Sequence, residues 1–187
     1  MDPLDYGRQS LLISLAGEAA ERAARRRGVD LTSRFVIRAA WHEAGHAITA
    51  SHVGWAVREL RVGTDRTHVI RGYYCGGSTR VTVPPLDSSV AVPQTDAAPP
   101  AETAAPTESN PREVPGDRSA AVAYAFLLSP EPCGWRSALA LIREANHVLD
   151  GLMHARFEHL QRIAYALLER DLTAGDFQRL IGGEHAA

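Results

Sequence analysis

The sequence predicts a mainly helical α+β domain, in which helices pack with a small antiparallel sheet and a disordered proline-rich loop interrupts the chain. Apolar residues recur at helical spacing in residues 8–27, in residues 33–53 and in the carboxy-terminal third. Residues 57–83 instead contain short β-branched and aromatic runs, which are typical of strands. Residues 84–117 hold eight of the 11 prolines and no aromatic residue, so this stretch has little to bury.

With 187 residues the chain is long enough for one domain with a core of its own, and we expect a single domain over residues 1–187. Its expected parts are an amino-terminal helix (8–27), a second helix followed by a small sheet (33–83), the disordered proline-rich insertion (84–117) and a carboxy-terminal helical part (118–187).

The second helix contains the most informative segment, His42-Glu43-Ala44-Gly45-His46, which is an HExxH sequence. Two histidines four residues apart project from one helical face, so both imidazoles can reach a single metal ion. Zinc held in this way lowers the pKa of its bound water to about 7. Glu43 follows the first histidine and can take a proton from that water, so the segment indicates a zinc peptidase with Glu43 as general base and His42 and His46 as metal ligands.

The alternative interpretation is a pair of ordinary histidines on an amphipathic helix. The helical pattern around the motif favours metal binding, because the motif stands in a helix with a recognisable beginning and end. We expect Thr32 or Ser33 to cap the start of this helix and Gly54 to end it in a left-handed conformation.

The remaining patterns place the other elements. We expect strands at 57–63, 68–70 and 79–83 to pair with one another around the intervening glycines. Thr173 and Asp176 resemble a capping box that opens a short final helix. The carboxy-terminal helices carry a nearly unbroken apolar stripe at helical spacing, typical of core: Leu149, Leu152, Met153, Phe157, Leu160, Ile163, Ala164, Leu167 and Leu168.

Composition excludes some functions. The net charge of −2 gives no global indication of nucleic-acid binding. All 20 basic residues are arginine, and a Walker A loop needs a lysine on the phosphates, so this chain cannot itself be a P-loop ATPase. Two cysteines without CxxC spacing favour a reducing, cytoplasmic location. No signal-like segment and no run of 18 apolar residues is seen, so we expect no membrane span.

Two segments resemble the peptidase domain of the FtsH-type zinc metallopeptidases, without the ATPase module of that family. Residues 38–48 are similar to the family's HEAGHA helix, and residues 159–173 are similar to its closing "LAxxLLExETL" pattern. The resemblance spans roughly residues 35–181, with the proline-rich stretch as an interruption. It implies His42 and His46 as zinc ligands, Glu43 as general base, a polypeptide substrate, a separate ATPase or regulatory partner, and an oligomer.

The third zinc ligand of that family is an aspartate at the start of a helix, and its position in this sequence falls on Gly134. Glu131 and Cys133 lie within three residues of it, and either could supply an anionic ligand. A second candidate set of metal ligands follows one side of a carboxy-terminal helix, where a solvated polar face explains the same spacing: His147, Asp150, His154 and Glu158. His52 is turned away from the ligand pair.

We therefore expect a zinc-dependent metallopeptidase that hydrolyses an extended or unfolded polypeptide laid along the strand that begins at Val57. A catalytically inactive interaction or regulatory module with the same fold is the alternative. A third reading is a regulatory peptidase that cleaves one partner protein.

Overall fold

The computed structural model describes residues 1–62, 69–70, 73–74, 77–85, 117–130 and 134–182. Within these residues the chain is mainly helical and carries a small antiparallel sheet, as the sequence predicts. The helices are α1 (Pro3–Arg26), α2 (Phe35–His52), α3 (Asp117–Leu128), α4 (Trp135–Ala155), α5 (Phe157–Glu169) and α6 (Ala174–Gly182). The strands are β1 (Ala56–Val62), β2 (Val69–Ile70), β3 (Tyr73–Tyr74), β4 (Gly77–Thr82) and β5 (Leu172–Thr173).

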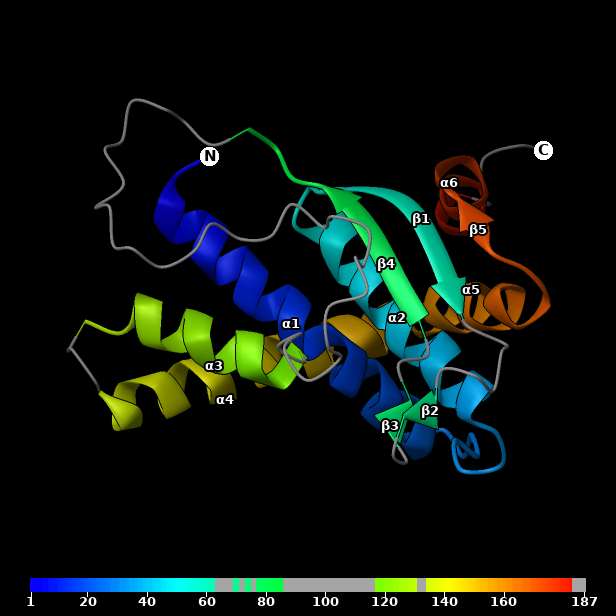
Figure 1. Ribbon diagram of the computed structural model, residues 1–187, viewed down its shortest axis with the longest axis horizontal. Coiled ribbons are helices and arrows are strands. Elements are labelled where there is room, and N and C mark those ends of the chain that lie inside the picture. The colour runs from blue at the N-terminus through cyan, green and yellow to red at the C-terminus, as the bar shows by residue number, and fades with distance from the viewer. Residues whose placement is uncertain (63–68, 71–72, 75–76, 86–116, 131–133, 183–187) are drawn as a thin grey trace.

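Helix α2 lies at the centre of the molecule, between α1 and α5, with β1 and β4 across another of its faces (Figure 1). Its Trp41 is fully buried and packs against the rings of Phe157 and Tyr165 on α5. The apolar stripe of α4 and α5 is buried at Leu149, Met153, Leu160, Ile163, Ala164 and Leu167, so its assignment to the core is confirmed.

Helices α1 and α2 pack closely because both present small residues at their contact. A Cβ atom built on Gly45 of α2 would lie 2.6 Å from the carbonyl oxygen of Ala16 and 2.6 Å from the Cβ of Ala20, both on α1. Alanine and glycine leave so little side chain between the helices that the backbone of α1 comes within reach of side chains on α2. This approach brings two groups of α1 to the histidines.

The three-stranded sheet has the order β4-β1-β5 and is antiparallel throughout. The predicted pairing of the strands near 57–63 and 79–83 is confirmed, with a register shift between Val57 and Glu59. The predicted pairing of residues 68–70 with these strands is wrong for Val69 and Ile70, which form a separate hairpin with β3. Since β1 has neighbours on both sides, the outer strand next to α2 is β4.

Helix ends follow the sequence in part. Gly54 follows α2 with a φ of +85°, as expected for a residue that ends a helix. The expected cap by Thr32 or Ser33 is wrong: Arg34 precedes α2 without a side-chain cap, and Thr32 bonds to Asp30 instead. The capping box is confirmed, because Thr173 and Asp176 exchange side-chain and backbone hydrogen bonds at the start of α6.

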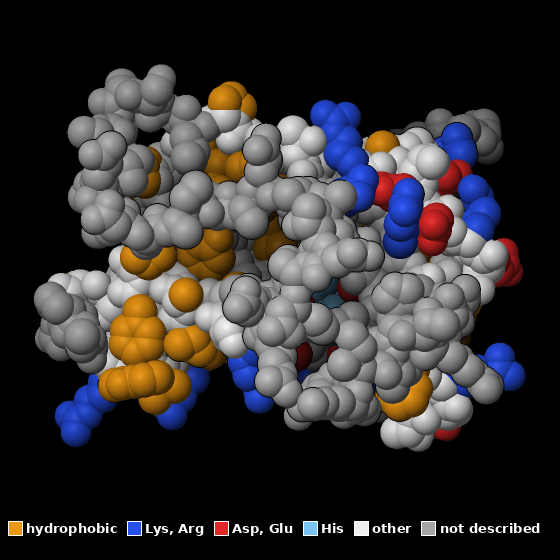
Figure 2. All heavy atoms as spheres, viewed as in Figure 1, with side chains coloured by type: hydrophobic (Ala, Val, Ile, Leu, Met, Phe, Trp, Pro, Cys, Tyr) orange, Lys and Arg blue, Asp and Glu red, His pale blue; other side chains and the backbone are white. Residues whose placement is uncertain are grey.

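The face drawn in Figure 2 has two kinds of surface. Apolar side chains gather over α3 and α4, where Leu127 and Trp135 are 69% and 63% exposed. Charged side chains gather over the three-stranded sheet, where Glu59 pairs with Arg61 and Arg80. Among the described residues no helix has both the length and the apolar character that a bilayer span requires.

Candidate metal centre

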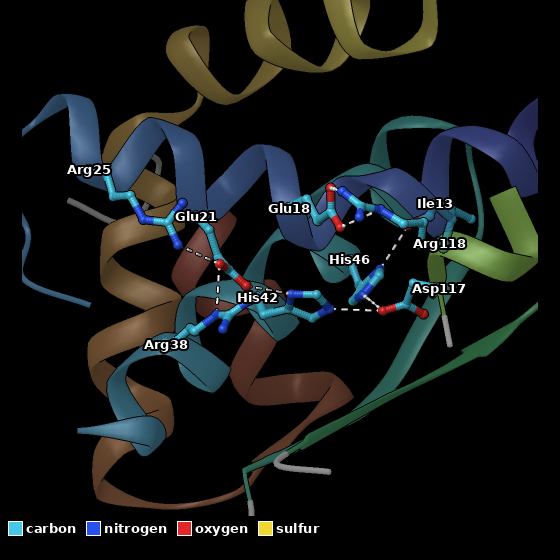
Figure 3. A network of polar contacts seen from close by, with 9 residues as sticks. All are labelled: Ile13, Glu18, Glu21, Arg25, Arg38, His42, His46, Asp117 and Arg118. Carbon is cyan, nitrogen blue, oxygen red and sulfur yellow. Dashed lines mark hydrogen bonds and ion pairs between the residues drawn. The ribbon is translucent and has the colours of Figure 1, made fainter. Parts of the chain in front are cut away.

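The two histidines of the HExxH segment lie one turn apart on α2 with their ring centroids 4.8 Å apart. His46 is buried and His42 is partly buried, with side chains 8% and 23% exposed. Both rings point toward the same spot beside the start of α3 (Figure 3). The geometry expected from their spacing is therefore present.

Asp117, the first residue of α3, completes the cluster. Its Oδ2 lies 2.9 Å from Nε2 of His42 and 3.3 Å from Nε2 of His46 (Figure 3). The ligand atoms of the three residues all lie within 4.8 Å of one another. Sequence reasoning missed Asp117, because it assigned this residue to the end of the proline-rich insertion, whereas the structure makes it the start of a helix.

The other ring nitrogen of each histidine is held by α1. Nδ1 of His42 lies 3.0 Å from Oε1 of Glu21, and Nδ1 of His46 lies 2.8 Å from the carbonyl oxygen of Ile13. Carboxylate and carbonyl oxygens only accept hydrogen bonds, so both Nδ1 atoms carry the proton and donate it. Each Nε2 therefore points toward the shared position, which is the arrangement seen around histidines that bind metal through Nε2.

Hydrogen bonds within the cluster shift the pKa values of His42 and Asp117 in opposite directions. Burial lowers the pKa of His42, but hydrogen bonds to Asp117 and Glu21 outweigh that effect and raise the pKa to about 10. Burial raises the pKa of Asp117, but hydrogen bonds from both histidines hold that pKa well below its usual range. His42 and Asp117 therefore hold each other through a direct hydrogen bond of 2.9 Å, and a metal bound by both would displace the proton between them.

These residues fit a divalent metal. Two imidazoles and one carboxylate are a ligand set of catalytic zinc sites, which keep a fourth position open. Ligand bonds of about 2.0–2.2 Å in a tetrahedral site separate the ligand atoms by about 3.4 Å. The 3.3 Å between His46 and Asp117 is close to this separation, whereas the 2.9 Å between His42 and Asp117 would have to lengthen and the ligand atoms, which lie within 4.8 Å of one another, would have to adjust around the ion. The ligand set alone does not distinguish zinc from other transition metals.

Glu43 lies beside the histidines but faces the sheet. Its buried carboxylate accepts a hydrogen bond of 2.7 Å at Oε2 from Oγ1 of Thr79 on β4. A Cβ atom on Gly77 would collide with the Glu43 side chain, so glycine at the start of β4 leaves the space that this carboxylate fills. Sequence reasoning missed both β4 residues, since neither carries a signal of its own.

None of the other predicted ligands that the structure describes is brought to the centre. Glu131 and Cys133 lie outside the described residues, and Gly134, which precedes α4, has no side chain to offer. His147, His154 and Glu158 are exposed on α4 and α5, Asp150 pairs with Arg22 and Arg26 of α1, and His52 is exposed at the end of α2. In the described part of the chain, His42, His46 and Asp117 are the one group of three metal-binding side chains that converge.

Comparisons of the chain with models of protein families, with curated proteins and with solved structures find no match. The likeness to FtsH-type peptidases therefore stays a prediction from two sequence segments. Function has to be inferred from the geometry of the cluster itself.

Proposed function

We propose that this protein is a zinc-dependent metallopeptidase. The observation that carries the proposal is that Nε2 of His42, Nε2 of His46 and a carboxylate oxygen of Asp117 converge on one position, while α1 holds the Nδ1 atoms of both histidines. An aspartate at the start of a helix is also the third ligand that the resemblance implies, although it stands at Asp117 rather than near Gly134.

The chain's own residues would divide the work as follows. His42, His46 and Asp117 would hold the metal, which when bound supplies Lewis acidity and a water of pKa about 7. Glu43 would accept a proton from the attacking water and pass it to the amine that leaves. Thr79 holds one oxygen of Glu43 through its 2.7 Å hydrogen bond and thereby keeps the carboxylate in a defined orientation.

The substrate would be an extended polypeptide. β4 is an outer strand of the sheet and carries Thr79, which contacts the proposed base, so a peptide added along β4 would run past the centre. This replaces the strand from Val57 as the docking edge, because β1 is the central strand. A separate ATPase or regulatory partner, an oligomeric state and a cytoplasmic location belong to the same proposal.

The test is the Glu43→Gln variant of the full chain. We expect zinc to stay bound at about one ion per chain, because the ligands are untouched, and cleavage of an unfolded casein to be lost. Glu18→Gln is the control, since Glu18 pairs with Arg118 and contacts neither histidine. Cleavage that persists in Glu43→Gln would show that Glu43 is not the base.

A catalytically inactive interaction or regulatory module is the second candidate. It is favoured by the way in which Asp117 and the two histidines satisfy one another through direct hydrogen bonds. Metal analysis of the purified protein distinguishes the two: zinc that disappears in His46→Ala supports the peptidase, and a stably folded protein without metal supports the module. If casein is not cleaved by the zinc-loaded protein, the remaining peptidase reading is an enzyme dedicated to a single partner.

A further inference from the structure

Glu21 is a carboxylate on α1 that is 3% exposed, although a buried charge is costly unless it is paired. Three side chains surround it in Figure 3: His42, Arg25 and Arg38. The two guanidinium groups lie 3.0 Å and 2.8 Å from it, and both arginines are themselves more than half exposed. Of the three charged residues, Glu21 is therefore the buried one, and it is also the one that contacts His42 of the metal centre.

The two oxygens of Glu21 are used differently. Oε2 accepts hydrogen bonds from both Arg25 and Arg38, while Oε1 lies 3.0 Å from Nδ1 of His42. If Glu21 served only as an ion-pair partner of Arg25 and Arg38, a carboxylate at the surface would do so without the cost of burial. The arginines instead balance the charge of an acid whose second oxygen is directed at the imidazole.

We propose that Glu21 is a positioning residue of the metal centre, which fixes the orientation of the His42 ring and keeps its proton on Nδ1. The inference deepens the proposed function and rests on its metal site. The ring of His46 is oriented in the same way by a hydrogen bond from its Nδ1 to the backbone carbonyl of Ile13, which no side-chain substitution removes. The bond from Glu21 is charge-assisted, so it is a stronger hydrogen bond than the one that His46 donates to a carbonyl.

The packing of α1 supports this role. Gly17 lies one turn before Glu21 on the same face of α1, and a Cβ atom built on Gly17 would collide with the ring of His42. The imidazole therefore lies flush against α1 between the backbone at Gly17 and the Glu21 carboxylate. Its Nε2 is left facing Asp117.

The experiment is a zinc titration against a chromophoric chelator, with the full-length protein and three variants. We expect Glu21→Gln to weaken zinc binding about ten- to hundredfold, as is typical for a lost partner of a ligand histidine. Glu18→Gln, one turn away and partly exposed, should bind zinc like the wild type. Arg38→Gln removes one ion pair of Glu21 but leaves its bond to His42, so its loss should be clearly smaller than that of Glu21→Gln.

A spectroscopic readout separates positioning from general stability. In the zinc-loaded wild type, the Nδ1 proton of His42 should give a strongly downfield NMR signal with ¹⁵N-labelled histidine, because it is hydrogen-bonded to a carboxylate. Glu21→Gln should shift that signal upfield and leave the signal of His46 unchanged. If Glu21→Gln does not fold, Glu21→Asp keeps the charge for the arginines but draws the carboxylate away from the ring, and should show the same losses.

Three outcomes would overturn the inference. Wild-type zinc affinity in Glu21→Gln would do so, as would an equal loss in Arg38→Gln, which would reduce Glu21 to an ion-pair residue. A wild-type chain that binds no zinc would overturn the proposed function and this inference with it. The zinc content of the wild type therefore tells the two failures apart.

Discussion

Replacing Asp117 by Asn tests the centre at the residue that the sequence did not indicate. Asparagine keeps the size of the side chain and can still serve at the start of α3, so the fold should survive. The charge is lost, and with it the anionic ligand. A zinc site with four protein ligands binds with about 10–16 kcal/mol, which is about 3 kcal/mol per ligand. Because the Asp117 side chain is 49% exposed, water can replace part of its contribution. We therefore expect an affinity loss of about ten- to hundredfold, at about 1.4 kcal/mol per factor of ten.

The assay is the zinc titration used for Glu21, together with the thermal midpoint of the metal-free protein. Asp150→Asn is the matched control, because Asp150 is also an aspartate that bonds to a neighbouring helix, in its case to arginines of α1, but lies outside the cluster. It should retain zinc affinity. If Asp117→Asn bound zinc like the wild type, the reasoning from convergence would be refuted, and the third ligand would have to come from residues such as Glu131 or Cys133.

Two further predictions follow from glycine packing and from capping. Gly17→Ala should weaken zinc binding, because the added methyl group displaces the His42 ring. Gly151→Ala is the control: its Cβ meets nothing within 4 Å, so it should leave zinc binding unchanged and stabilise the fold by about 0.5–1 kcal/mol. Equal behaviour of the two variants in zinc titration and urea unfolding would contradict the contact between Gly17 and His42. Hydrogen bonds from Thr173 and from Arg170 hold the pKa of Asp176 below its usual range, so Asp176 stabilises the folded state above about pH 4 and progressively less as the pH falls. Asp176→Asn should accordingly lower the melting temperature at pH 7, and the difference from the wild type should shrink in acid; a difference independent of pH would rule out the charge as its cause.

The helices and the main strand pair could be predicted from the sequence because their signals are local. The four-residue spacing of His42 and His46 fixes a common face as soon as the segment is helical. The alternating pattern near 57–63 likewise fixes which side of β1 is buried: Val57, Leu60 and Val62 are buried, with the register shift after Val57 accounting for the changed alternation. The predicted pairing of residues 68–70 with β1 is wrong for Val69 and Ile70, because so short a strand carries too little pattern to choose a neighbour.

Asp117 could not be predicted because its role depends on a contact across 71 residues from His46. Its neighbours in sequence are prolines, serines and charged residues, which say nothing about where the next helix starts in space. The expected third ligand at residues 131–134 was placed by aligning the chain with a family pattern, which carries no information on distances in the fold. An acidic residue at the first position of a helix was the one signal present, but such residues are common because they complement the helix dipole.

The groups on α1 were missed for a different reason, which is also the clearest sign of how the centre is built. A backbone carbonyl such as that of Ile13 has no residue type to detect, and a glutamate in an arginine-rich helix looks like an exposed ion-pair partner. Three helices nevertheless contribute different chemical groups to the centre: α2 supplies two imidazoles, α3 a carboxylate, and α1 the acceptors that orient both rings. An ion bound there would join α2 to α3 directly and α1 through hydrogen bonds, so its binding energy would stabilise the packing of these three helices specifically. The small residues between α1 and α2 are therefore part of the metal site, because only their close approach brings a carbonyl and a carboxylate within reach of the histidines.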